Sequence, residues 1–550
     1  MNAAHVCVIG LIGLVLGYFF YSRYIAFSVF GLEENEPVPS KELEDGVDFV
    51  PTARPVLFGH HYASIAGAAP IIGPAIAVVW GWAPALIWVV VGSVFMGAVH
   101  DFSTLVISVR NKGQSIGQIS AKVIGPRTAT LFLLVIFCLV MLVIAVFAKA
   151  IAGLFVKFPG TVLPINFEII VALGIGWICY KRGGKLLWPS IAALLALYGM
   201  IFVGVENPLS LGSIVGDENQ SIAWVVLLLI YSFIASVLPV WILLQPRDYI
   251  NSHQLFVGLA ALILGILVAQ PEFSAPAFAD PPSDAPPILP FLFVTIACGA
   301  ISGFHGLVSS GTTSKQIACA TDCRPIGYGA MLGEGLLALI ATLAVSAGLA
   351  DWAAHYDTFA HAAKGSIGAF VEGAAMFLGA LGMPTAPAQV VIAVMVISFA
   401  ATSLDTGVRI QRYILQELGE RYSIPGLSNR YVAGIVAVVM PLGLCLGGQE
   451  RALWPLFGVT NQLLAGLSLI VVTLWLKQSG RRYLPVAIPM VLVLVITTTA
   501  LVSKLAQYLE NGQHFLLGVG TLILALQFWV ILEALMAARR GGPVGETVTS

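Results

Sequence analysis

The segment Leu57–Ala75, LFGHHYASIAGAAPIIGPA, decides the fold of this chain. It is apolar enough for a membrane-spanning helix, yet Gly67, Pro70, Gly73 and Pro74 fall in its middle. Proline removes a backbone donor and glycine weakens a helix. The sequence therefore predicts a broken helix near Gly67 and Pro70; a simple proline kink relieved by neighbouring helices is the alternative.

A helix that breaks inside a membrane can bind cargo through its own backbone. Carbonyls at the end of the first half can hold a cation, and the N–H groups that open the second half, those of Ile71, Ile72 and Gly73, can hold a carboxylate. We therefore expect a binding site here. The residues predicted to bind substrate are Gly67, Ala68, Pro70, Ile71, Ile72, Gly73, Pro239 and Asn461.

Composition places the whole chain in the membrane. Of 550 residues, 58% are hydrophobic and 10% are charged, whereas an ordinary soluble domain is about 25% charged. The mean hydropathy is +0.92. These values disfavour a soluble enzyme, a disordered protein and a nucleic-acid binder. The net charge of −1 implies no polyanionic partner.

The apolar runs predict an all-α polytopic membrane protein with about 15 transmembrane helices, because a span needs roughly 20 apolar residues. The first run shows no clear cleavage site, so we expect it to be retained as a helix. Segment 366–382 is expected to be interfacial or re-entrant. The predicted spans are 5–22, 57–79, 84–109, 128–156, 166–180, 186–204, 222–245, 255–270, 288–310, 326–349, 387–408, 431–447, 454–475, 484–503 and 514–537.

The basic residues predict the orientation of these spans. Of the 27 Lys and Arg residues, 22 fall in loops on one side, Arg247 among them, and Lys149 falls within a span. The opposite loops carry the other four: Lys157, Lys364, Arg451 and Lys504. Because basic loops remain in the cytoplasm, we expect the N-terminus outside and the C-terminus inside.

Several ionisable residues within or beside the spans are candidates for ion or proton coupling. His60 and His61 are candidates because a histidine side chain ordinarily changes charge near neutral pH, although one or both could simply bond to a neighbouring helix. Asp405 is a candidate carboxylate, yet its i,i+4 spacing from Arg409 also fits a salt bridge that anchors the helix end. Arg247 and Asp248 are read as a cytoplasmic gate pair, with a positive-inside anchor as the alternative for the arginine.

The remaining polar interruptions are less specific. Pro239 interrupts the predicted span 222–245, and Asn461 lies deep enough to line a cavity or to bond between helices. The motif CATDC gives Cys319 and Cys323 a loose spacing with no second pair, so small core residues are favoured and a metal site is the lesser alternative. No metal or cofactor is predicted. A membrane enzyme or a channel is disfavoured, because the chain lacks clustered catalytic motifs and a continuous polar stripe.

Six segments together resemble the signature blocks of the carbon starvation protein A (CstA) family. The resemblance implies a bacterial inner-membrane importer of a small nutrient, pyruvate or a peptide, driven by proton symport. The sequence leaves open whether H⁺ or Na⁺ couples, and it leaves the oligomeric state open. The blocks are LFGHHYASIAGAAPIIGP, GAVHDFSTLVISVR, ASVLPVWILLQPRDY, GAISGFHGLVSSGTTSK, FAATSLDTGVRIQRYI and LWPLFGVTNQLLA.

The same resemblance implies a LeuT-like inverted-repeat core with broken helices and extra peripheral helices. We expect repeats at 57–204 and 222–408, flanked by 1–56 and 409–550. A bundle that contains 57–79 and 222–245 is expected to rock against the scaffold and give alternating access. In this scheme the eighth core helix, 288–310, supplies hydroxyls to the first. The predicted cation or proton site combines the carbonyls of Ala66 and Ala69 with the hydroxyls of Ser309, Ser310 or Thr313.

Overall fold

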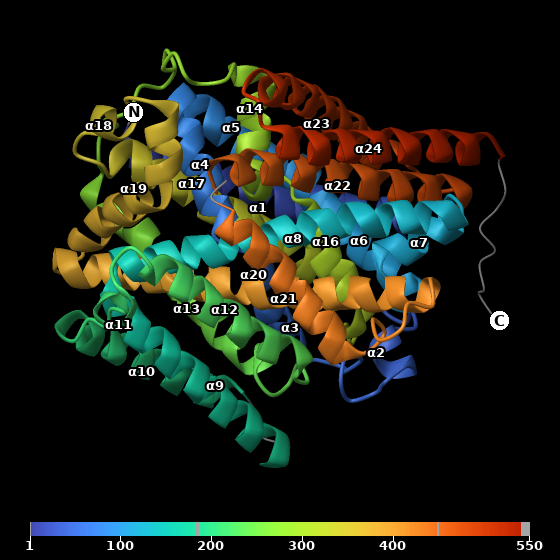
Figure 1. The fold of residues 1–550 in the computed structure, drawn as a ribbon, viewed down its shortest axis with the longest axis horizontal. Coiled ribbons are helices and arrows are strands. Elements are labelled where there is room, and N and C mark those ends of the chain that lie inside the picture. The colour runs from blue at the N-terminus through green and yellow to red at the C-terminus, as the bar shows by residue number, and fades with distance from the viewer. Residues whose placement is uncertain (1, 183–185, 448–449, 541–550) are drawn as a thin grey trace.

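The computed structural model describes residues 2–182, 186–447 and 450–540, and within these ranges it is helical apart from loops and one isolated bridge between Thr52 and Ile317. Figure 1 shows the arrangement. The helices that position the site are α3 (Arg54–Ile65), α4 (Ala69–Ala77), α5 (Trp82–Gly92), α6 (Ala98–Arg110), α7 (Ile116–Val123), α8 (Pro126–Lys157), α12 (Gln220–Val237), α13 (Leu244–Ala269), α14 (Ile288–Thr295), α15 (Ala297–Ala300), α16 (Gly303–Gly311), α17 (Ala330–Ala347), α20 (Thr385–Arg421), α21 (Arg430–Leu446) and α22 (Glu450–Gln478).

The other helices surround this core. Large apolar side chains such as Ile170 and Leu195 are exposed on α9 and α10, which fits a lipid-facing hairpin. In Figure 1 that hairpin lies at the edge of the molecule away from α23 and α24. These peripheral elements are α1 (Ala3–Leu16), α2 (Pro39–Glu42), α9 (Val162–Arg182), α10 (Leu187–Glu206), α11 (Gly212–Val215), α18 (Trp352–His355), α19 (Phe359–Gly379), α23 (Leu484–Glu510) and α24 (His514–Arg540).

Each of the fifteen predicted spans overlaps a helix or a broken helix of the described chain. Twelve helices are long and apolar enough to cross a membrane, and the bent pair α3–α4 makes thirteen. The other two predicted spans correspond to the interrupted run α14–α16 and to α21, which has 17 residues. Segment 366–382 falls largely within the 21-residue helix α19.

The break predicted near Gly67 and Pro70 is confirmed. Helix α3 ends at Ile65, Ala66 leaves the helical conformation at φ −76° and ψ 56°, and α4 begins at Ala69. The two halves are bent by 46°. Pro70 lies in the first turn of α4, where its missing N–H costs no hydrogen bond.

The second interrupted helix is α14–α16, not the predicted span 222–245. Ile301 and Ser302 adopt extended conformations between α15 and α16. Helix α12 instead ends at Val237, and Pro239 lies in the turn that leads to α13. The predicted span 255–270 is part of a single helix that begins at Leu244. Pro239 therefore separates two spans and forms no mid-membrane break.

The two broken helices run side by side in opposite directions. Helix α4 packs against α14 and α15, while α3 packs against α16. Further pairs follow the same order along the chain: α5 packs against α17, α8 against α20 and α12 against α21. Ordered pairing of antiparallel counterparts is the arrangement of an inverted repeat. The core of the protein is thus the LeuT-like fold that the sequence predicted.

Gly73 allows the closest approach between the broken helices. A Cβ atom at this position would collide with the backbone carbonyl of Thr295. We predict that Gly73→Ala destabilises the protein by about 1–3 kcal/mol, because backbone cannot move aside as a side chain can. Thermal unfolding in detergent measures the loss. Gly199→Ala is the matched control, since its Cβ would meet no atom within 4 Å, and equal unfolding temperatures for the two variants would contradict the prediction.

An ion pair ties the loop after the first span to α6. Arg110 Nη2 lies 2.7 Å from Glu36 Oε1, and Arg110 Nε donates to Glu36 Oε2 at 2.8 Å. Burial alone would raise the pKa of Glu36, but the bonds from Arg110 and from the Glu33 amide outweigh it and lower the pKa. Stability from this carboxylate is therefore present above its ordinary pKa and is lost as the pH falls through the lowered value.

We predict that Glu36→Gln lowers the unfolding temperature at about pH 7, and that the difference from the unmodified protein shrinks in acid. Thermal unfolding scans in detergent, repeated from about pH 7 into acid, measure this difference in unfolding temperature. Glu44→Gln changes an exposed carboxylate of the same loop and serves as the control. A difference in unfolding temperature that stays the same as the pH is lowered would contradict the stabilising role of the Glu36 carboxylate.

Candidate functional site

Two of the predicted substrate residues at the first break, Ile71 and Ile72, offer no free backbone donor. The amides of Ile71 and Ile72 both donate to the carbonyl of Ala68, at 3.1 and 3.0 Å. The predicted carboxylate site on these two N–H groups is therefore wrong for this conformation, because the first turn of α4 satisfies its own donors. Gly73 packs directly against the backbone of α14, as described above.

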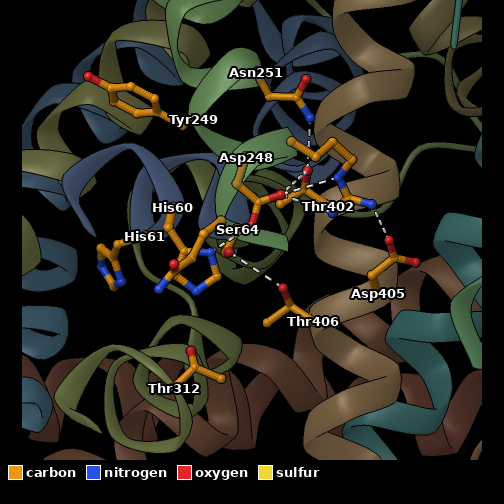
Figure 2. Close-up of polar contacts among 12 residues, drawn as sticks. His60, His61, Ser64, Asp248, Tyr249, Asn251, Thr312, Thr402, Asp405 and Thr406 are labelled. Carbon is orange, nitrogen blue, oxygen red and sulfur yellow. Dashed lines mark hydrogen bonds and ion pairs between the residues drawn. The ribbon is translucent and has the colours of Figure 1, made fainter. Parts of the chain in front are cut away.

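Helix α20 supplies the hydroxyl groups at the break. Ser403 Oγ donates to the carbonyl of Ser64 at 2.9 Å, and Thr406 Oγ1 lies 3.4 Å from Ser64 Oγ. A side chain at Gly67 would meet Ser403 and Phe147. Figure 2 shows Ser64 and Thr406 facing each other across this contact.

The predicted cation site is not assembled. Ser310 donates to the carbonyl of Gly306 at 2.7 Å and accepts from the amide of Ile116, so it faces α6 and α7. Thr313 Oγ1 lies 2.8 Å from His61 Nδ1. Ser309 Oγ is buried without a hydrogen-bond partner in the described chain. The scheme assigned 288–310 as the eighth core helix, but the α9–α10 hairpin shifts the count, and α20 takes that place.

Asn461 joins the halves of the second broken helix. Its Oδ1 accepts from the amide of Phe304 at 2.9 Å, and its Nδ2 donates to Ser302 Oγ at 2.9 Å. Its backbone also lies so close to Gly303 that a Cβ there would collide with it. Asn461 therefore satisfies the backbone at the second break, and its predicted role in binding substrate is not supported by these contacts.

A chain of buried charges, here called the arginine network, joins α3, α13 and α20. His60 Nδ1 lies 2.6 Å from Asp248 Oδ2, and Asp248 Oδ1 accepts from Arg247 Nη2 at 2.9 Å. Arg247 Nη1 forms an ion pair with Asp405. All four side chains are at most 2% exposed.

Neighbouring hydroxyl and amide groups complete the arginine network. Ser232 donates to Asp405 at 2.6 Å, and Tyr231 accepts from Arg247 at 2.6 Å. Thr402 donates to Asp248 at 3.1 Å and accepts from Asn251 at the same distance. Figure 2 shows Asp248, Thr402 and Asn251 converging between α13 and α20.

This network corrects one predicted placement and one predicted pairing. Arg247 and Asp248 do pair, but they lie buried within α13, so Arg247 belongs to no cytoplasmic loop. Asp405 pairs with Arg247 rather than with Arg409. Arg409 instead donates to the carbonyls of Ala235 and Leu238 at the end of α12.

A second group of buried charges, here called the histidine cluster, joins α6, α16 and α17. Asp101 accepts from both sides: His100 Nδ1 lies 2.8 Å from Oδ1, and His305 Nδ1 lies 2.9 Å from Oδ2. His305 Nε2 lies 3.2 Å from Glu334 Oε2. All four residues are completely buried. No group of these residue types within the described chain has the geometry of a metal site.

Charge counting shows what each group needs to be neutral. The arginine network holds two carboxylates and one permanent cation, so it is neutral when it carries one added proton. The histidine cluster holds two carboxylates and no permanent cation, so it is neutral when it carries two. Uncompensated charge is very costly inside a membrane protein. Protons are therefore the charges that would balance either group.

Sequence reasoning missed the histidine cluster. Asp101 and Glu334 both lie beside His305, but they come from α6 and α17. Both are ionisable residues inside predicted spans, which is the one signal that could have found them. Glu168 of α9 is a further buried carboxylate, and it accepts from Ser398 at 2.9 Å.

A cavity of about 800 Å³ opens beside the broken helices at one end of the core. It lies between α4, α8, α14, α19, α22 and α23, and its wall includes Ile72, Val294 and Thr295. Of the predicted substrate residues, Ile72 alone is among the described residues that line it. The cavity thus reaches the level at which α4 and α14 touch.

The opposite end of the core is closed by residues 33–53, here called the strap. Asp48 accepts from Tyr413 at 2.6 Å and lies 3.6 Å from Arg409 Nη1. The amide of Thr52 donates to Gln316 at 3.1 Å, and Gln316 also accepts from Gln245. The strap therefore contacts α13, α20 and the segment after α16 together.

Comparison with known proteins assigns the family. The family model described as carbon starvation protein CstA matches residues 2–355 and 345–500. The peptide transporter CstA of Bacillus subtilis (strain 168) is 34% identical, over 88% of this chain and 87% of that protein. The peptide transporter CstA of Campylobacter jejuni is 32% identical, over 93% and 82%.

The relatives include a symporter. The pyruvate/proton symporter BtsT of Escherichia coli (strain K12) is 33% identical, over 92% of this chain and 82% of that protein. Among solved structures, MhsT in complex with L-phenylalanine matches with a TM-score of 0.46 and 13% identity, covering 89% of this chain and 99% of that chain. The relatives named here are transporters and not enzymes. With the family model matching most of its length, this multi-pass membrane protein belongs to the carbon starvation protein CstA family.

Proposed function

We propose that the protein is a secondary transporter that imports a small carboxylate nutrient, pyruvate or a related monocarboxylate, together with protons. The observation that carries this proposal is the histidine cluster, in which Asp101 and Glu334 are buried against His305 of the broken helix α14–α16. The relative named as a pyruvate/proton symporter supports the same coupling. We place the protein in the bacterial inner membrane, in contact with the lipid bilayer.

The two adjacent histidines on α3 connect this helix, which is proposed to move, to buried polar groups on its neighbours. His60 bonds to the arginine network and His61 bonds to Thr313 beyond α16. Neighbouring residues on a helix point about 100° apart, so one helix can contact two different groups. A shift of α3 would change both contacts at once, and a change in protonation would in turn favour one position of α3.

Alternating access follows from two sets of five helical spans. We propose repeats at 54–269 and 288–478, with the α9–α10 hairpin inserted in the first, in place of the expected 57–204 and 222–408. The broken pair α3–α4 and α14–α16 would rock against α8 and α20. We place the cavity at the outer face, the strap at the cytoplasmic face and the N-terminus outside, following the basic loops.

Import of a peptide is the second candidate. Several relatives are named peptide transporters, and a cavity of about 800 Å³ is large enough for a dipeptide. Sodium coupling is less favoured, because the hydroxyls predicted to hold a cation bond elsewhere.

Uptake by the purified protein in proteoliposomes tests this function. We predict accumulation of labelled pyruvate when the outside is more acidic than the inside, and no accumulation under a sodium gradient alone. A labelled dipeptide is tested in parallel under both gradients. Accumulation of the dipeptide without pyruvate would transfer the function to the second candidate, and accumulation of neither would contradict transport of this class.

A substitution in the histidine cluster separates proton coupling from substrate passage. We predict that Glu334→Gln lowers pH-driven uptake by at least about tenfold, because removing the charge removes one proton from the neutral state. Exchange of labelled for unlabelled substrate at equal pH should persist. Glu372→Gln on α19 is the control, since that carboxylate is half-exposed. A Glu334→Gln protein that still accumulates substrate at the normal rate would remove the histidine cluster from the coupling mechanism.

A further inference from the structure

Four lysines line the cavity that opens beside the broken helices. Lys149 and Lys157 come from α8, Lys364 comes from α19 and Lys504 comes from α23. Within the described chain no Asp or Glu contributes to its wall. Three separate helices therefore bring cations to one space.

This concentration stands out against the charge distribution of the chain. In the predicted topology only five of the 27 basic residues do not belong to the strongly basic side of the membrane, and four of those five line this cavity. The side chain of the fifth, Arg451, is outside the described part. A cavity that simply exposes surface lysines would be expected to include carboxylates as well, since the chain has 28 Asp and Glu residues.

Local packing holds two of these ammonium groups at the cavity. Lys504 is 9% exposed, and its Nζ donates to Gln507 at 2.8 Å and lies 5.0 Å from the centre of the Phe291 ring. A side chain at Gly368 would occupy the place of the Lys157 ammonium group. The missing side chain of Gly368 thus leaves room for a cation beside α19.

We propose that these four lysines form an anion-capture site through which the cargo enters as a small organic carboxylate of net negative charge. Like charges in a cavity with low-dielectric walls focus a positive potential, which can raise the local concentration and the association rate of an anion by about 10- to 1,000-fold. The four cations also disfavour a cationic competitor of similar size. This site rests on the proposed transport function, but its potential exists whether or not transport occurs.

The electrostatic part is tested without any transport substrate. Ala363→Cys places a thiol in the cavity wall and leaves every lysine intact. We predict that an anionic methanethiosulfonate reagent modifies this thiol at least about tenfold faster than a cationic one, relative to a free thiol and after subtraction of labelling in the unmodified protein. Adding Lys157→Gln and Lys364→Gln should reduce the ratio at least about threefold. A ratio near one would overturn the anion-capture site.

The specificity part is tested by uptake. We predict that the double variant Lys157→Gln/Lys364→Gln raises the KM for pyruvate about fivefold or more with little change in kcat. Added salt should narrow the difference in KM between this variant and the unmodified protein. Lys122→Gln removes an exposed charge from α7, at the other end of the core, and should change neither value. A loss confined to kcat would overturn the proposal. If labelling shows the potential but the unmodified protein takes up no pyruvate, the anion site stands and the proposed substrate fails.

Discussion

A helix that stops inside a membrane leaves peptide groups that lipid cannot satisfy, and this constraint organises the core. At the first break, Ser403 of α20 donates to the carbonyl of Ser64. At the second break, Asn461 of α22 accepts from the amide of Phe304. Each broken helix is therefore held by a polar side chain from a neighbouring helix that is itself largely or wholly buried. The breaks can persist only because this surrounding scaffold is present.

The buried charges follow from the same arrangement. Because α3 carries adjacent histidines, the helix contacts the arginine network on one side and the segment after α16 on the other. The histidine cluster lies between α6, α16 and α17, so it also touches one of the two broken helices. Neutrality in each group depends on bound protons. In the proposed mechanism, protonation and helix position are linked through these direct contacts rather than through a distant relay.

Local sequence predicted the first break and most spans, because glycine, proline and apolar runs act over a few residues. It failed where polar residues inside a helix are satisfied by distant partners. The run Pro246–Asn251 falls between two predicted spans, yet it is part of α13, where Asp405 and Thr402 of α20 bond to it. Helix α20 likewise continues past Arg409, whose partners lie on α12 and in the strap.

The candidate site was predictable only in part. His60, His61 and Asp405 were recognised as candidates because each is an ionisable residue in an apolar setting. Pairing could not be predicted: His305 and Asp101 are 204 residues apart, and no local spacing indicates that they meet. The inserted α9–α10 hairpin also shifted the helix count. The hydroxyl donors were therefore expected on α16, whereas α20 takes that place in the structure.

In the proposed mechanism, substrate binding is linked to protonation of the buried groups. Adding pyruvate to the detergent-solubilised protein in weakly buffered solution, with a pH-sensitive dye, measures this linkage directly. We predict that the protein takes up protons when pyruvate binds between about pH 6 and pH 8. This uptake should be absent when Glu334 and His60 are both replaced. Substrate binding with no proton uptake anywhere in that range would contradict it.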